Sequence, residues 1–218
     1  MSIKKILMSA ICTVSILVST ASAENKENTE PWTAPLEAAI LEGFGTRFTI
    51  LLPPIEAYRI GVFSPPPGDG FGFIGNTFPA SDSTREIYLG ITSENFPASS
   101  AHKTAVDRLN ENVDRFIANM PMLKSKSSHI SQDISLSQDG HPARLIRIAH
   151  ENEVIRRDLL FVAADNREWR IDILYYILEP QQSTRIDTIF SSIKIDRSNA
   201  TEPVIHFDGF QPTKSFEE

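Results

Sequence analysis

The sequence is poor in cysteine and has no excess of positive charge, and each shortage excludes a class of protein. The single cysteine among 218 residues, Cys12, allows no disulfide within the chain. The 21 Lys and Arg residues are outnumbered by 28 Asp and Glu residues, which gives a formal net charge of -7. Because a nucleic-acid binder needs basic side chains to neutralise phosphates, we expect no nucleic-acid partner.

The first residues have the order of a secretory signal peptide: positive charge, an apolar stretch and then small residues. Lys4 and Lys5 precede the apolar residues 6–18, and Ala21, Ser22 and Ala23 follow. This stretch is shorter than the roughly 20 residues that span a bilayer, so we expect no stable membrane anchor. Cleavage near Ala23 would remove 23 residues, two of them lysines and none acidic, and leave 195 residues with a net charge of -9.

The position of the cysteine indicates where the mature chain resides. Cys12 lies inside the apolar part of the signal, so the exported protein would have neither thiol nor disulfide. Small secreted domains of eukaryotes usually depend on disulfides, whereas a bacterial periplasm or medium does not require them. We therefore expect a periplasmic or secreted protein.

Composition and periodicity predict one folded domain between two polar flanks. We expect a signal peptide over 1–23, a flexible or partly helical segment over 24–45, a single domain over 46–196 and an extended tail over 197–218. Alternating apolar residues predict strands, and apolar residues three and four apart predict helices. The predicted strands are 46–52, 85–92, 130–137, 143–149, 154–162, 168–178 and 193–195, and the predicted helices are 102–120 and 184–192.

The order of strands, helix, strands and helix predicts an antiparallel α+β sandwich. A two-residue signal at Asp139-Gly140 marks one hairpin, because glycine accepts the positive φ of such turns. A three-residue turn over 165–167 would form the next hairpin and pair Ala163 with Trp169. That register would place apolar residues of both strands on one face.

Three short segments resemble the Mog1/PsbP-like superfamily. They are the opening strand 48–53, the central turn 140–143 and the closing segment 189–195, in which Ser192 and Ile193 lead from a helix into the last strand. The resemblance covers about 46–196 and implies a central antiparallel sheet sandwiched by helices, used mostly to bind other proteins. It supplies no shared catalytic residues, and the insert over 53–79 departs from it.

Linear motifs reveal no catalytic residue, metal site or cofactor. The Gly-x-Gly-x-x-Gly run at 70–75 follows three prolines where a dinucleotide site needs a strand. The five histidines have neither the spacing nor the cysteine partners of a zinc site. Asp158 and Asp172 could meet on one sheet face as acid and base, although nearby arginines would satisfy them as cross-strand pairs.

The insert holds the candidate surface for recognising a partner. Between 63 and 78 the phenylalanines stand among prolines and glycines, and a single charge accompanies them. Aromatic side chains on a loop bury much area with few rotatable bonds, which suits recognition; alternatively they cover one end of the core. The proposed partner-binding residues are Phe63, Asp69, Phe71, Phe73 and Phe78.

We expect an exported, periplasmic, non-enzymatic module that binds another protein in an adaptor, assembly, envelope-stress or toxin-neutralising role. A carrier of a small apolar ligand is the alternative, with its cavity between the helix 102–120 and the sheet. A hydrolase without a linear motif is a weaker one. The cavity residues of the carrier hypothesis are Phe116, Trp169, Ile171 and Tyr175.

Overall fold

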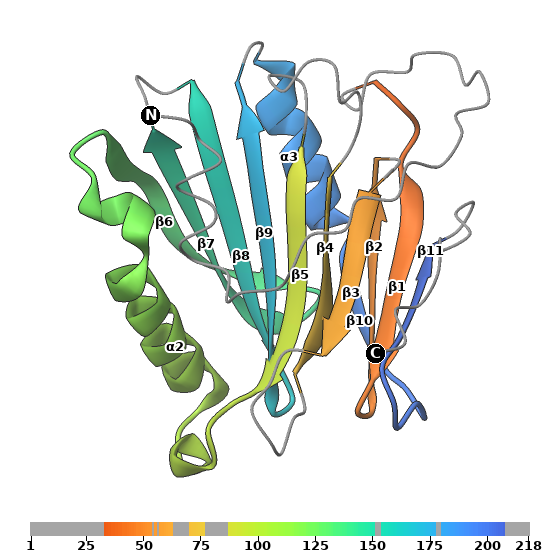
Figure 1. The fold of residues 1–218 in the computed structure, drawn as a ribbon. Helices are drawn as coiled ribbons and strands as arrows, with labels where there is room; N and C mark the ends of the chain where they lie inside the picture. Colours follow the sequence, from red (N-terminus) through yellow and green to blue (C-terminus); the bar gives the residue numbers. More distant parts are fainter. Residues whose placement is uncertain are drawn as a thin grey trace.

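A computed structural model describes residues 33–53, 55, 57–62, 70–76, 87–150, 154–177 and 180–207. Within these ranges the chain forms two antiparallel sheets and two α-helices (Figure 1). Neither helix is both long enough and apolar enough to cross a membrane. The α+β class and the antiparallel pairing predicted from the sequence are confirmed.

The larger sheet has seven strands in the order β3-β4-β5-β9-β8-β7-β6, and the smaller has four in the order β10-β2-β1-β11. The strands of the larger sheet are β3 (Ala57–Val62), β4 (Phe71–Asn76), β5 (Tyr88–Asn95), β9 (Arg167–Tyr176), β8 (Ile155–Ala164), β7 (His141–His150) and β6 (Ser128–Gln138). Those of the smaller sheet are β10 (Lys194–Arg197), β2 (Thr46–Leu52), β1 (Glu37–Gly43) and β11 (Val204–Phe207).

The two helices pack in different places. Helix α2 (Ala105–Asn119) contacts β7 and β8 and is capped by Thr104, whose hydroxyl accepts the backbone N–H of Asp107. Helix α3 (Gln181–Ser191) packs towards β2 of the smaller sheet (Figure 1). Two 3-10 turns, η1 (Ala98–Ser100) and η2 (Pro121–Lys124), flank α2. The larger sheet therefore has α2 on one face, and α3 with the smaller sheet on the other.

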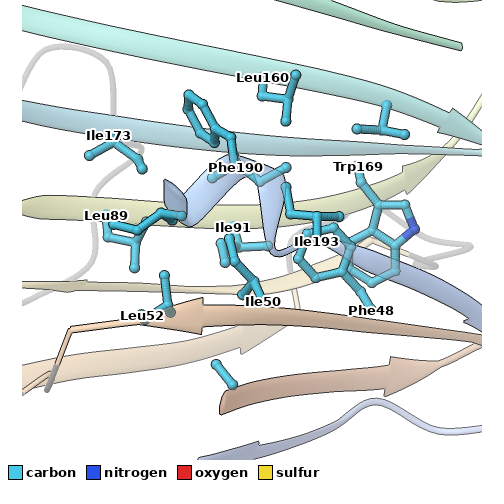
Figure 2. Packing of buried hydrophobic residues seen from close by; sticks show 14 of the residues in the cluster. Phe48, Ile50, Leu52, Leu89, Ile91, Leu160, Trp169, Ile173, Phe190 and Ile193 are labelled. Atoms are coloured by element: carbon cyan, nitrogen blue, oxygen red, sulfur yellow. The ribbon is translucent and has the colours of Figure 1, made fainter. Parts of the chain in front are cut away.

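Each face of the larger sheet has its own hydrophobic core. The main core joins both sheets and α3, and within it Phe48 stacks on Trp169 (Figure 2), with ring centroids 4.5 Å apart. The second core lies under α2 and contains Leu159, Phe161 and Val113. Strand β8 is buried at most positions because both faces of the sheet are covered there. Its sequence is accordingly an apolar run over most of its length, as is typical of strands buried on both faces.

Ser192 and Ile193 lead from helix α3 into β10, as the resemblance implies. Ser192 ends α3, and its hydroxyl accepts the backbone N–H of Leu51 in β2 at 2.8 Å. Ile193 is buried in the main core just before β10 begins. One serine thus links the end of α3 to β2.

Three segments expected to be irregular contribute strands. Residues 37–43, expected to be flexible or partly helical, form β1, and the tail contributes β11, which pairs with β1. The insert over 53–79 contributes β3 and β4. The insert was hard to recognise because glycines and prolines interrupt it, whereas β1 and β11 pair with each other from distant parts of the chain.

The predicted pairing of β8 with β9 is wrong by one residue. Ala163 pairs with Glu168 and Val162 pairs with Trp169, because Asp165 and Asn166 alone form the turn. Asp165 adopts the left-handed conformation, with φ at 52°, which a two-residue hairpin turn requires. A slip of one residue changes which residues of the two strands share a face, so it changes the expected site as well.

Candidate functional site

A polar recess lies on the face of the larger sheet that carries the main core, beyond the point where the apolar residues end. Along β8 the residues on this face change from Val162 and Leu160 to Asp158 and Arg156. Helix α3 supplies Ser183 at the other side. The recess has a volume of about 370 Å³, within the usual range for small-molecule sites. Its lining residues are Ser131, Gln132, Arg147, Arg156, Asp158, Tyr175 and Ser183.

Asp158 is the buried charge at the base of the recess. The residue is fully buried, and burial raises the pKa of its carboxyl from 3.8 to about 6 although Arg147 and the Tyr175 hydroxyl act in the opposite direction. The Tyr175 hydroxyl donates to Asp158 Oδ2 at 3.2 Å, whereas the buried Oδ1 accepts no hydrogen bond from the described residues. A buried acceptor without a hydrogen bond costs free energy. A ligand that donates a hydrogen bond to Asp158 Oδ1 would remove that cost.

Arg147 connects the base of the recess with helix α3. Its Nε lies 3.4 Å from Asp158 Oδ2 without hydrogen-bond geometry, and its Nη2 donates to Asp187 of α3. Arg156, on the neighbouring strand, donates from Nη1 to the Ser131 hydroxyl at 3.0 Å. The recess thus contains two guanidinium groups, of Arg147 and Arg156, and one buried carboxylate, of Asp158. Ser131 contacts both arginines, and Arg147 lies beside Asp158.

Strand β6 forms one side of the recess and one edge of the larger sheet. It is eleven residues long and exposed over most of its length, and the pairing with β7 is irregular between Ile130 and Gln132. The Ser131 hydroxyl at this irregularity donates to the Arg147 carbonyl at 3.2 Å. Ile130 and Ile134 expose 39% and 40% of their surface, so this edge carries apolar side chains in solvent.

Two of the five proposed partner-binding residues lie in the core. Phe71 and Phe73 belong to β4 and are 1% and 0% exposed. Phe71 contacts Trp169 edge to face, and Phe73 contacts Phe207 of β11 in the same way. Their burial corrects the expectation that they lie on an accessible loop and agrees with the alternative that they cover the core. Phe63, Asp69 and Phe78 lie outside the described residues.

The cavity of the carrier hypothesis does not form between the sheet and helix α2. Trp169, Ile171 and Tyr175 belong to the main core on the other face of the sheet, whereas Phe116 of α2 contacts Phe161. Arg170, beside Trp169 in sequence, lies over the Phe116 ring instead. The one-residue slip in the β8–β9 register is the physical reason, because it exchanges the residues that face α2.

The two carboxylates considered as acid and base lie on opposite faces. Asp158 faces the recess, and Asp172 pairs with Leu159 in register and receives two hydrogen bonds from Arg157. They therefore cannot act together on one substrate. Among the described residues no group of three or more His, Cys, Asp or Glu side chains is placed to hold a metal ion.

The recess could have been found from one signal in the sequence. Arg156 and Asp158 occupy alternate positions in strand 154–162 that continue the row of Leu160 and Val162, so charges enter a core-facing row. A charged residue in such a row must be paired or functional. The partners from β6 and α3 could not be identified, because they are distant in the sequence.

The architecture is an α+β fold, and the comparison with solved structures shows that it is similar to a PsbP fold. No family model and no curated protein matches the sequence. Among solved structures, the cyanobacterial PsbP protein CyanoP from Synechocystis sp. PCC 6803 is similar with a TM-score of 0.51 and 12% identity. The match covers 80% of this chain and 98% of CyanoP.

Two further structures are similar at lower TM-scores. PA94 from Pseudomonas aeruginosa, a protein of unknown function, matches with a TM-score of 0.40 and 14% identity over 66% of this chain and 88% of its own. LpqN of Mycobacterium tuberculosis, which is involved in cell envelope biogenesis, matches with a TM-score of 0.40 and 10% identity over 72% of this chain and 91% of its own. At such identities the likeness concerns the fold alone.

Proposed function

We propose that the chain is an exported, periplasmic, non-enzymatic module that binds another protein. The signal-like N-terminus supports export, and the acidic composition supports a basic partner. The placement of Asp158 and Asp172 on opposite faces supports binding rather than acid–base catalysis, because these were the paired carboxylates that the sequence offered.

The exposed edge strand β6 carries this proposal. An edge strand presents unpaired backbone N–H and C=O groups, which another chain can pair with by adding a strand. Proteins that avoid such pairing shorten the edge or place charges on it. Strand β6 has eleven residues and a single formal charge, Asp133, which Arg144 binds through two hydrogen bonds of 2.8 Å. The edge is therefore long and locally neutral.

The chemistry of the edge defines the partner segment. An extended segment with apolar or β-branched residues would pair its backbone with β6 and cover Ile130 on one face of the sheet and Ile134 on the other. The acidic charge of the whole chain would accelerate the approach of a basic partner, and the association rate would then fall as salt rises. A rate that does not change with salt would contradict this part of the proposal.

The test is native mass spectrometry of the mature protein isolated gently from its host, with variants at the edge. Ile134→Lys places a charge on β6, and Val106→Lys places the same charge on α2, where Val106 is 50% exposed. We expect a stoichiometric protein companion with the wild type and with Val106→Lys, and its loss with Ile134→Lys.

Two outcomes would contradict the proposal. A companion that stays bound to Ile134→Lys would place the interface elsewhere. A dimer of the chain itself that Ile134→Lys dissolves would assign β6 to a second copy instead of another protein. Melting temperatures of all three proteins show whether the variants remain folded, since both substitutions lie on exposed positions.

A further inference from the structure

The recess borders the edge proposed to bind a protein, because Ser131 and Gln132 belong to β6, and the nature of its lining restricts what it can bind. All seven lining residues carry polar side chains, contributed by β6, β7, β8, β9 and α3. Small-molecule sites are usually lined by apolar side chains with a few polar ones. An apolar ligand would leave these groups without partners, so the ligand must itself be rich in hydrogen-bonding groups.

Among the residues that the structure describes, the charges around the recess balance. Arg147 contacts both Asp158 and Asp187, and Arg156 lies on the strand position diagonal to Arg147. With both carboxylates ionised, two positive and two negative groups give no net charge. An ionic ligand would lose its hydration without gaining a net counter-charge, and that desolvation is costly. The arrangement therefore favours a neutral ligand over a charged one.

The polar groups of the recess include both a hydrogen-bond acceptor and a donor without hydrogen-bond partners in the described part of the chain, so a matching ligand must both donate and accept hydrogen bonds. The buried Asp158 Oδ1 requires a donor, because the Tyr175 hydroxyl reaches only Oδ2. Arg147 Nε is a buried donor that lacks an acceptor in hydrogen-bond geometry. The Ser183 hydroxyl is hydrogen-bonded to Tyr175 and can still accept from a ligand. Among neutral groups the hydroxyl provides one donor and two acceptor positions on a single atom.

We propose that the recess binds a neutral polyhydroxylated compound, a carbohydrate, with one hydroxyl donating to Asp158 Oδ1 and further oxygens accepting from Arg147 and Arg156. Two adjacent hydroxyls on a ring can donate to the carboxylate and accept from a guanidinium at once. The volume of about 370 Å³ is at the lower end of the range for small-molecule sites, which suits one or two sugar rings.

The test uses saturation-transfer NMR at pH 7.5 with glucose, N-acetylglucosamine and maltose as neutral probes, and glucuronate as a charged one. Ser183→Leu blocks the wall of the recess, and Thr184→Leu is its control at the adjacent exposed position of α3. We expect at least one neutral probe to bind, Ser183→Leu to weaken it roughly tenfold or more, and Thr184→Leu to leave it unchanged.

Three results would overturn the proposal: no binding by any neutral probe, tighter binding of a charged probe than of every neutral one, or equal binding by Ser183→Leu and the wild type. Gln132→Ala, on the exposed strand β6, serves as a second site variant, since its removal cannot disturb the core. It is expected to weaken the neutral probe as well. Ile134→Lys, which tests the protein-binding edge, distinguishes the two proposals because Ile134 does not line the recess.

Discussion

Replacement of Asp158 by Asn is expected to change how stability depends on pH. Burial raises the pKa of Asp158 from 3.8 to about 6 in the folded protein. The folded state therefore binds the proton more tightly than the unfolded state between these two values, and the contribution of Asp158 to stability falls as pH rises through that window. At 1.36 kcal/mol per pKa unit, the shift corresponds to about 3 kcal/mol.

Asp158→Asn retains the shape and an acceptor for the Tyr175 hydroxyl but cannot ionise. The free energy of unfolding of the variant, minus that of the wild type, should therefore increase by about 2 kcal/mol between pH 4 and pH 7.5, because the unfolded carboxyl is already partly ionised at pH 4. The charged or titratable groups that face Asp158 are Arg147, Arg156, Tyr175 and Asp187. All four are present in both proteins, so their own effects largely cancel in the difference.

Urea unfolding followed by tryptophan fluorescence at several pH values measures this difference, since Trp169 is buried in the main core. The same pair should be measured in a Glu168→Gln background, because burial raises the pKa of that carboxyl to about 7. The Asp158 difference should persist there. A difference that stays constant from pH 4 to pH 7.5, or that changes with the opposite sign, would refute the reasoning about Asp158.

Two further predictions concern strand β4. Phe73→Ala should lower the free energy of unfolding by about 3–5 kcal/mol in urea titrations, because Phe73 is fully buried against Phe207; a loss below about 1 kcal/mol would indicate an exposed loop. Gly72→Ala should lower the melting temperature more than Gly90→Ala, because a Cβ at position 72 would lie 2.0 Å from the Ile91 carbonyl oxygen, whereas at position 90 the nearest atom is 3.8 Å away. Equal melting temperatures would contradict the close approach of β4 and β5.

Local patterns in the sequence predicted the strands and helices that carry regular periodicity. The helix over 102–120 was expected from apolar residues three and four apart, and α2 occupies 105–119. The hairpin at Asp139-Gly140 was expected from its turn residues, and both adopt positive φ. These features depend on neighbours in sequence, which is why periodicity and turn chemistry suffice for them.

The elements that were missed depend on partners distant in the sequence. Strand β1 pairs with β2 and with β11, and β11 comes from the opposite end of the chain. Strand β4 packs into the core through the contact of Phe71 with Trp169, which is distant in the sequence. The register of β8 against β9 was off by one because a turn of two or three residues fits the same sequence. That one residue decides which side chains share the recess with Asp158, so the site could not be assembled from the sequence.

The most direct measurement of the proposed function is hydrogen exchange on the mature chain, alone and with its purified companion. A strand added to the edge would bond the outward-facing amides of β6, so we predict slower exchange over Ser128–Gln138 in the complex. Exchange in helix α2, which packs on β7 and β8, should stay unchanged. Protection that is confined to other segments, with β6 exchanging equally in both samples, would contradict binding at this edge.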